Sequence, residues 1–415
     1  MSMTSGAFGG ARAVNGAQTV LARSEPGAKE LDPEQVGNRA ESLSLNLRKR
    51  VVGQDSAIRE VVASYQTYLA GMCSPGRPLC NFLFLGPTGS GKTLLVEATA
   101  ESLVGNGRAV LKIDCAEFQH SHEIAKLVGS PPGYLGHRET QPLFSQETLD
   151  ARQTDVVKLN FVLFDEIEKA SDALWHLLLG VLDKGTLRTG DNRTVDFSRA
   201  MIFMTSNLGA CEMNTLLLNK WGFASPEVAR RQEAGIPEDG IEDKLCRSSV
   251  EAARRKFTPE FMNRIDKTIV FKPLVISDLR KVLALELNIV QKRLFNAPDG
   301  SAFVFTLTEA ARDYLLAEGT DLKYGARHLK RAIDRHLVSP LSNLIGSGQV
   351  AGGDLIEVGW NPKASRLTFL RAAESLPAYR MAQMVDSSTA PDLVARLTPT
   401  PNRLPNTASV RSIHR

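Results

Sequence analysis

The chain has 415 residues, with 50 lysines and arginines against 46 acidic residues and a net charge of +4. This mild balance argues against a nucleic-acid binder, and no apolar stretch reaches the roughly 18 to 20 residues that a membrane span needs. The five cysteines are scattered without a C-x-x-C pair, which is typical of reduced thiols, so we expect a cytoplasmic protein without nucleic-acid or membrane partners.

Composition and hydrophobic pattern divide the chain into four segments. Residues 1–47 show no sustained period, and we expect a flexible N-terminal arm there. Residues 48–272 alternate between strand and helix patterns, and residues 273–371 are predicted to form a smaller domain that is mainly helical. Residues 372–415 become rich in Pro, Ser and Thr, which predicts a disordered tail.

Short apolar runs between residues 48 and 272 are separated by amphipathic helical patterns. Each run is almost continuously apolar, as expected for a strand of a parallel sheet that is covered on both faces. Five runs are predicted as strands: 81–85, 109–114, 161–165, 200–205 and 267–271. The predicted fold class is therefore α/β, a doubly wound parallel sheet of five strands, followed by a small helical domain.

A glycine-rich loop follows the first predicted strand and precedes a helical run. Its sequence GPTGSGKT matches the G-x-x-x-x-G-K-[ST] pattern of a phosphate-binding P-loop. Backbone N–H groups of such a loop form an anion site at a helix N-terminus. We expect Lys92 to contact the β- and γ-phosphates of ATP and the Thr93 hydroxyl to bind Mg²⁺. The predicted nucleotide-binding residues are Gly86, Pro87, Thr88, Gly89, Ser90, Gly91, Lys92 and Thr93.

Polar residues end two other predicted strands. Asp165 and Glu166 follow the third run, and Asn207 follows the fourth. Because ligands of open α/β sheets bind at the carboxyl ends of the strands, these residues are predicted to lie beside the P-loop. Asp165 would bind Mg²⁺, Glu166 would orient or deprotonate the attacking water, and Asn207 would help to position it. An asparagine after a strand is also a common turn residue.

The stretch GSPPGYLG, residues 129–136, places Tyr134 and Leu135 in a loop of glycines and prolines. Such a loop cannot continue a helix or a central strand. Two large apolar side chains there either anchor the loop to the core or contact another molecule. The residues of the loop do not decide between these readings.

With these motifs, the chain resembles the AAA+ ATPases, specifically the ATPase module of the Clp unfoldases and disaggregases (the ClpA/ClpB class). The resemblance covers roughly residues 48–360. Its motifs, in chain order, are VVGQDSAI, GPTGSGKT as Walker A, GSPPGYLG as the axial pore loop, FVLFDEIEKA as Walker B, MTSNLG as sensor 1, FTPEFMNRID as the arginine-finger segment and YGARHLKRAI as sensor 2.

The resemblance implies roles for residues that their own pattern leaves open. It implies that Val52 lies on the adenine side of the nucleotide and that Arg327 contacts the nucleotide from the small domain. Arg264 would be a finger that reaches a neighbour's γ-phosphate, which implies a homo-hexamer. Tyr134 and Leu135 would grip a polypeptide substrate in the pore.

Three further segments keep two interpretations each. Trp221-Gly222-Phe223 resembles the tripeptide with which some Clp ATPases dock a protease partner, but Trp and Phe at a helix end also pack into a core. The loop carrying Lys184, Arg188 and Arg193 resembles a second pore loop or is an ordinary solvated hairpin. The long segment before Walker B is a docking element or, as we favour, a tolerated surface insertion.

The leading hypothesis is an ATP-driven ring that threads or remodels polypeptides. One alternative is an ATPase that remodels a single dedicated partner or assembles as a nucleotide-gated scaffold. Another is a nucleic-acid motor, which the near-neutral charge and the lack of a basic stripe make less favourable. Relatives of the ClpA/ClpB class usually carry two ATPase modules, whereas one is visible here.

Overall fold

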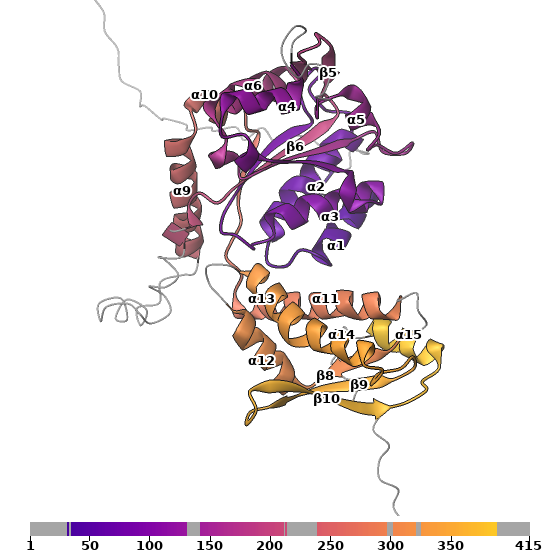
Figure 1. Ribbon diagram of the computed structural model, residues 1–415. Helices are drawn as coiled ribbons and strands as arrows, with labels where there is room; N and C mark the ends of the chain where they lie inside the picture. Colours follow the sequence, from indigo (N-terminus) through magenta and orange to yellow (C-terminus); the bar gives the residue numbers. More distant parts are fainter. Residues whose placement is uncertain are drawn as a thin grey trace, which may run out of the picture. The chain divides into compact units, whose positions relative to one another are not determined.

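The computed structural model of the protein describes residues 31–32, 35–130, 142–210, 212–213, 239–296, 302–320 and 325–387. The described residues between Asn38 and Ser387 belong to one unit, whose helices and strands are shown in Figure 1. The helices and strands of its first part are α1 Asn38–Arg48, α2 Asp55–Leu69, β1 Cys80–Leu85, α3 Lys92–Val104, β2 Val110–Asp114, α4 Ala125–Val128, α5 Gln146–Asp150, β3 Asn160–Asp165, α6 Asp172–Lys184, β4 Thr186–Arg188, β5 Thr194–Asp196, β6 Ala200–Ser206, α9 Asp239–Lys256, α10 Pro259–Met262 and β7 Lys267–Val270.

Five parallel strands form the central sheet, in the order β2-β3-β6-β1-β7. All five predicted strands are confirmed, within one residue at each end. Side chains alternate between the two faces along each strand, so Phe82 and Phe84 of β1 face one layer of helices and Leu83 and Leu85 face the other. The α/β class is therefore correct, and it places the carboxyl ends of β1, β3 and β6 side by side.

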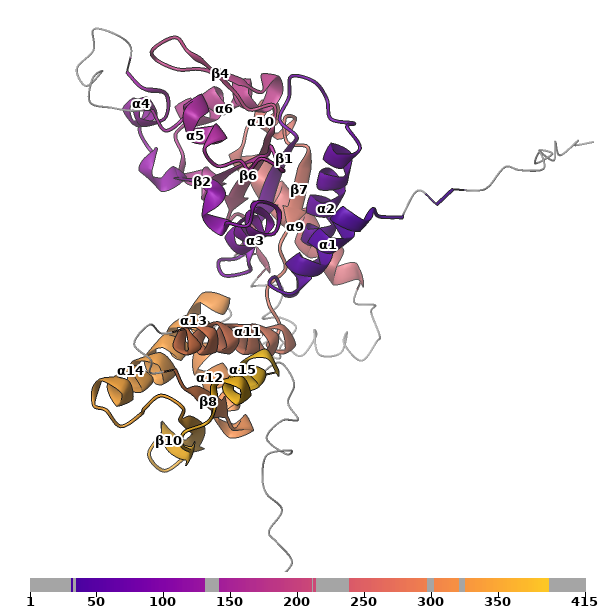
Figure 2. The same ribbon diagram turned by 90° about the vertical axis from the view of Figure 1, so that its right-hand side faces the viewer.

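Helices α1, α2 and α3 cover one face of the sheet (Figure 2). Within this layer Phe82 stacks on Phe203 of β6, with ring centroids 5.0 Å apart. Helix α6 and the ends of α9 and α10 cover the other face, where Trp175 packs edge-on against Phe257. The central strands are buried on both faces, which explains their almost continuous apolar sequences.

The expected arm of residues 1–47 is wrong from residue 38 onward. Ala40, Leu43 and Leu47 of α1 are buried at helical spacing against α2 and α3, so this segment belongs to the folded unit.

The prediction that the long segment before Walker B is a surface insertion is also wrong for its described part, residues 142–160. Phe144 is fully buried, with its ring 5.4 Å from that of Phe197, and this part contributes to the core.

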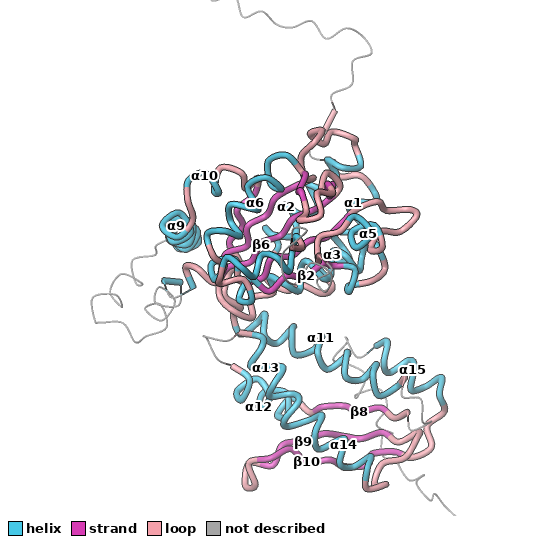
Figure 3. The backbone as a smooth tube through the Cα atoms, turned by 45° about the horizontal axis from the view of Figure 1, so that its top comes forward, coloured by secondary structure: helices cyan, strands magenta, loops and turns pink. Residues whose placement is uncertain are grey.

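The second part of the unit combines helices with a small sheet (Figure 3). Its elements are α11 Ile276–Phe295, β8 Val304–Leu307, α12 Glu309–Gly319, α13 Ala326–Ile333, the π-helical turn Asp334–Val338, α14 Ser339–Gly346, β9 Leu355–Asn361, β10 Arg366–Ala373 and α15 Ala378–Ser387. The strands pair in the order β10-β9-β8, and the helices from α11 to α14 pack on this sheet around one apolar cluster. The expectation of a mainly helical domain omitted β9 and β10.

The expected tail does not begin at residue 372. Strand β10 continues to Ala373, and α15 follows it. Met381 and Val385 of α15 are buried against Val304 and Phe295. The Pro and Ser content of this region concealed a short amphipathic helix. Among the helices that the structure describes, none is both long and apolar enough to cross a bilayer.

Candidate active site

Lys92 is the first residue of α3 and lies in the P-loop between β1 and this helix. Its Nζ donates to the carbonyls of Gly86 (2.7 Å) and Pro87 (2.9 Å) and to Oδ1 of Asn207 (3.0 Å). The residue is 7% exposed. Burial lowers the pKa of Lys92 to about 8, although the nearby carboxylates of Glu168 and Asp165 oppose the shift. A cation with depressed pKa at a helix N-terminus gains from an anionic ligand.

The P-loop backbone runs very close to the end of β7. Phe271 N–H donates to the carbonyl of Leu85 (2.7 Å), and a Cβ on Gly86 would lie only 2.5 Å from the carbonyl oxygen of Phe271. Gly86 also has a φ of 140°, so any side chain there would both clash and strain the backbone. The Ser90 hydroxyl donates to the Pro87 carbonyl (2.8 Å) and closes the loop.

Asp165 and Glu166 lie at the end of β3, as the sequence predicts, and Thr205 of β6 joins them. The Thr205 hydroxyl donates to Oδ1 of Asp165 and accepts a hydrogen bond from the Glu166 N–H (3.1 Å). Glu166 has a left-handed backbone, with a φ of 56°, a costly conformation for a residue other than glycine. Asn207 Nδ2 donates to Oε1 of Glu166 (3.2 Å), which links this carboxylate through Asn207 to Lys92.

Three charged residues near the acids were not predicted. Lys169 forms an ion pair with Oε2 of Glu166, and Lys112 of β2 lies 3.3 Å from Oδ2 of Asp165. Oε1 of Glu168 accepts a hydrogen bond from the Asn207 N–H (3.0 Å). Glu168 and Lys169 follow Glu166 within two and three residues, so the charge run after the strand was the available signal. Lys112 gave none, because a lysine in a strand usually faces solvent.

Gln54 is a further residue that the sequence did not single out. It is 2% exposed, and its Nε2 donates to the carbonyls of Ser90 (3.1 Å) and Lys272 (2.8 Å), while its Oε1 accepts from the Lys272 N–H (3.1 Å). Gln54 thus joins the P-loop to the segment that leads into α11. Val52, the predicted adenine contact, is half-buried two residues before it.

Arg327 lies in the first turn of α13, which approaches the P-loop. The Ala326 N–H donates to the carbonyl of Gly89 (3.3 Å). The charge of Arg327 is among the causes that lower the pKa of Lys92, which places the two cations in the same neighbourhood. A phosphate group would relieve their mutual repulsion.

Arg264 lies away from this cluster, between α10 and β7. Its Nη1 contacts Oε1 of Glu260 (3.2 Å) and donates to the Glu260 carbonyl (3.0 Å), and its Nη2 lies 4.0 Å from Oδ2 of Asp183. The structure therefore brings Lys92, Asp165, Glu166 and Asn207 together and does not bring Arg264 to them.

Several predicted residues lie outside the described part of the chain. These are Tyr134 and Leu135 of the proposed pore loop and Trp221, Gly222 and Phe223. The second predicted loop is described as the hairpin of β4 and β5, and its three basic residues, Lys184, Arg188 and Arg193, are exposed. The hairpin therefore exists, and its role remains a prediction.

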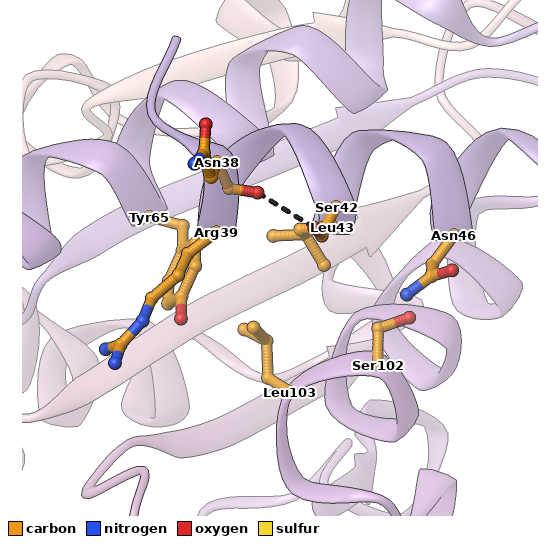
Figure 4. A pocket seen from close by; sticks show the side chains of 8 residues that line it. All are labelled: Asn38, Arg39, Ser42, Leu43, Asn46, Tyr65, Ser102 and Leu103. Atoms are coloured by element: carbon orange, nitrogen blue, oxygen red, sulfur yellow. Dashed lines mark hydrogen bonds between the residues drawn. The ribbon is translucent and has the colours of Figure 1, made fainter.

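A shallow cavity of about 290 Å³ lies among α1, α2 and α3 (Figure 4). Arg39, Asn46, Tyr65 and Ser102 are among its lining residues, and the Ser42 hydroxyl donates to the Asn38 carbonyl (2.8 Å) at its side. Ser102 is ten residues along α3 from Lys92, about 15 Å at the helical rise. The cavity is thus separate from the P-loop.

The P-loop follows β1, Asn207 follows the adjacent strand β6, and the two acids end β3, the strand beyond it. This arrangement defines a nucleoside triphosphatase of the P-loop class. Comparisons with known proteins specify the family. Residues 77–268 match the AAA domain (Cdc48 subfamily), and residues 274–358 match the C-terminal, D2-small domain, of ClpB protein. The chain belongs to the AAA+ ATPases of the Clp class and has the two domains of their second ATPase module.

Individual relatives agree with this assignment. The chain is 38% identical to a Chaperone protein ClpB of Meiothermus ruber over 328 residues, 79% of this chain and 35% of the relative. It is 38% identical to that of Bdellovibrio bacteriovorus over 325 residues, 78% of this chain and 34% of the relative. The chain thus spans about a third of the length of these relatives.

A solved structure also matches. This structure is a closed-state cryo-EM reconstruction of Hsp104 with ATPγS and FITC casein. This chain is 27% identical to it in sequence and superposes with a TM-score of 0.64. The match covers 80% of this chain and 52% of that chain. The AAA+ fold predicted from the motifs is confirmed.

Proposed function

We propose that this chain hydrolyses ATP within a homo-oligomeric ring, a hexamer by analogy with its class, and uses the energy to thread or remodel polypeptides. The observation that carries the proposal is the position of Arg264 relative to the P-loop. Arg264 adjoins the start of β1, where its carbonyl accepts a hydrogen bond from the Asn81 side chain (3.0 Å). The P-loop begins at the other end of the same strand, at Gly86.

The two ends of β1 are too far apart for Arg264 to serve its own site. Gly86 is five positions after Asn81, which is about 17 Å at the extended rise per residue. An arginine side chain spans less than half of this distance. If Arg264 contacts a γ-phosphate, that phosphate therefore belongs to another copy of the chain, and the active site is complete only in an assembly.

Within one chain, the remaining residues suit ATP hydrolysis. Lys92 and Arg327 would bind the phosphates, and the hydroxyl of Thr93 with the carboxylate of Asp165 provides oxygen ligands of the kind that Mg²⁺ prefers. Bound Mg²⁺ would neutralise phosphate charge. Glu166 would accept a proton from the attacking water, and Asn207, which already donates to Glu166, would orient both.

Polypeptide as the substrate rests on the relatives and on one loop. The curated relatives are named chaperones, and the Hsp104 structure was determined with casein. Tyr134 and Leu135 would supply the apolar contact to an extended chain. A protease partner at Trp221-Gly222-Phe223 is a finer proposal, which we base on the tripeptide alone.

The test compares ATP hydrolysis with and without unfolded casein in the native chain and in Tyr134→Ala. We expect casein to stimulate the native chain and not the variant, with equal rates in the absence of casein. Tyr379→Ala is the matched control, because Tyr379 is 63% exposed on α15; it should retain the stimulation. Stimulation that persists in Tyr134→Ala would remove the loop from the mechanism. Hydrolysis that casein never stimulates would favour a single dedicated partner.

A further inference from the structure

Asn81 is a buried polar residue at the start of β1, with no role in the site described so far. It is fully buried. Its Nδ2 donates to two backbone carbonyls, those of Leu182 and Arg264, at 3.0 Å each. Its backbone N–H donates to Oδ2 of Asp266 (2.8 Å), and its carbonyl accepts from the Asp266 N–H (3.0 Å). One asparagine thus joins three segments of the chain.

The segments that Asn81 joins are those that surround the side chain of Arg264. Leu182 precedes Asp183, whose carboxylate lies 4.0 Å from Nη2 of Arg264. Asp266, two residues after Arg264, also lies 3.7 Å from Nη2 of Arg77. The Arg264 side chain is 24% exposed. Asn81 therefore holds the backbone of Arg264, while the guanidinium of Arg264 lies close to the carboxylates of Asp183 and Glu260.

We propose that Asn81 is a positioning residue for Arg264: its amide holds the arginine-bearing segment and the end of α6 against the strand that leads to the P-loop. This inference rests on the proposed function, because it assumes that Arg264 acts on a neighbouring copy. Both amide hydrogens are used: one donates to the Leu182 carbonyl in a buried hydrogen bond and the other to the Arg264 carbonyl in a partly buried one. A serine or alanine could not bridge both.

The arrangement couples two sites through one strand. β1 carries Asn81 at one end and the P-loop at the other, and it is buried at every position. Close packing gives protein interiors a low compressibility, so a shift at one end of such a strand is transmitted along it. A movement of the P-loop strand would therefore carry Arg264 with it toward or away from the neighbour's phosphate.

The experiment uses mixtures of two inactive chains. The donor carries Glu166→Gln, so its own site is inactive but its Arg264 is present. The acceptor carries Arg264→Ala, so its site is intact but it offers no finger. Mixing should restore hydrolysis. Adding Asn81→Ala to the donor should lower the restored rate about 10- to 100-fold, since small misplacements of a positioned group cost this much.

Asn160→Ala in the donor is the matched control. Asn160 is also a buried asparagine at the start of a strand, β3, but its side-chain Oδ1 accepts a hydrogen bond from Nε2 of Gln153 (3.2 Å), which follows α5, and not from the Arg264 segment. It should destabilise the donor comparably and leave the restored rate unchanged. Light scattering and nucleotide binding establish that each donor assembles. If the donor with Asn81→Ala does not assemble, a donor with Asn81→Ser takes its place in the same comparison.

The outcomes separate the two proposals. Equal restoration by the Asn81 and Asn160 donors would overturn the positioning role and leave the finger intact. If the parent mixture fails to restore hydrolysis although both chains assemble together, Arg264 does not act in trans, and both proposals fall. We expect the restored rate of hydrolysis to fall with the Asn81→Ala donor and not with the Asn160→Ala donor.

Discussion

The affinity of this chain for ATP is expected to weaken in mildly alkaline solution, because burial lowers the pKa of Lys92 to about 8. Lysine binds phosphate as the charged form. With this pKa, about nine-tenths of the nucleotide-free chains carry a charged Lys92 at pH 7 and about one-tenth at pH 9. Bound phosphate stabilises the charge, so the complex keeps its proton at pH 9.

The sign and size of the effect follow from this linkage. Below pH 8 Lys92 is already charged, and the Kd should hardly change with pH. Above pH 8 each binding event must take up a proton, so the Kd rises. Between pH 7 and pH 9 the charged fraction falls about tenfold, which weakens binding about tenfold, or about 1.4 kcal/mol.

The assay is a titration with a fluorescent ATP analogue at pH 7, 8 and 9, in EDTA so that Mg²⁺ makes no contribution. Calorimetry in two buffers of different ionisation enthalpy counts the protons taken up. Lys92→Arg is the control, because a guanidinium stays charged throughout this range; its Kd should not change with pH. A Kd that is constant in the native chain, or that rises equally in Lys92→Arg, would refute the reasoning.

Two further substitutions test other contacts. A Cβ on Gly190, in the β4–β5 hairpin, would lie 2.5 Å from the carbonyl oxygen of Gly129. Gly190→Ala should therefore displace the base of the Tyr134 loop and reduce the stimulation of ATP hydrolysis by casein at least about twofold. Gly180→Ala, whose nearest contact is at 4.0 Å, should leave the stimulation unchanged, and equal stimulation in the two variants would contradict the prediction. Met381→Ala should lower the free energy of unfolding by about 2 kcal/mol in denaturant titrations, because Met381 is 5% exposed. Tyr379 is exposed on the same helix, so if Met381→Ala costs no more than Tyr379→Ala, α15 is not docked in solution.

The sequence predicted the sheet and the place of the P-loop between β1 and α3 well, because both are local patterns. Each central strand is buried on both faces and is therefore a continuous apolar run, and the loop sequence fixes its own backbone. The small domain was predicted less well. β9 and β10 have alternating or irregular burial, and their antiparallel pairing joins residues such as Trp360 and Leu367, which no helical or continuous pattern reveals.

Contacts between distant segments could not be predicted at all. Gln54 bonds to Lys272, 218 residues later, and Asn81 bonds to Arg264, 183 residues later. Gln54 lies in the VVGQDSAI motif and Asn81 in a predicted strand, but neither pattern says which carbonyls the fold places beside the side chain. Thr205 is similar, since only the pairing of β3 with β6 brings its hydroxyl to Asp165.

These contacts suggest how nucleotide would change the site. Lys92 now donates to Asn207, Asn207 donates to Glu166, and Glu166 pairs with Lys169. If a phosphate bound the Lys92 ammonium, Oδ1 of Asn207 would lose this donor and would be available to accept a hydrogen bond from the attacking water, while Nδ2 would keep its bond to Glu166. The Glu166 N–H, which donates to the Thr205 hydroxyl in a left-handed backbone, would keep this bond. We therefore expect the strained Glu166 backbone to stay fixed when nucleotide binds, while its side-chain partners change.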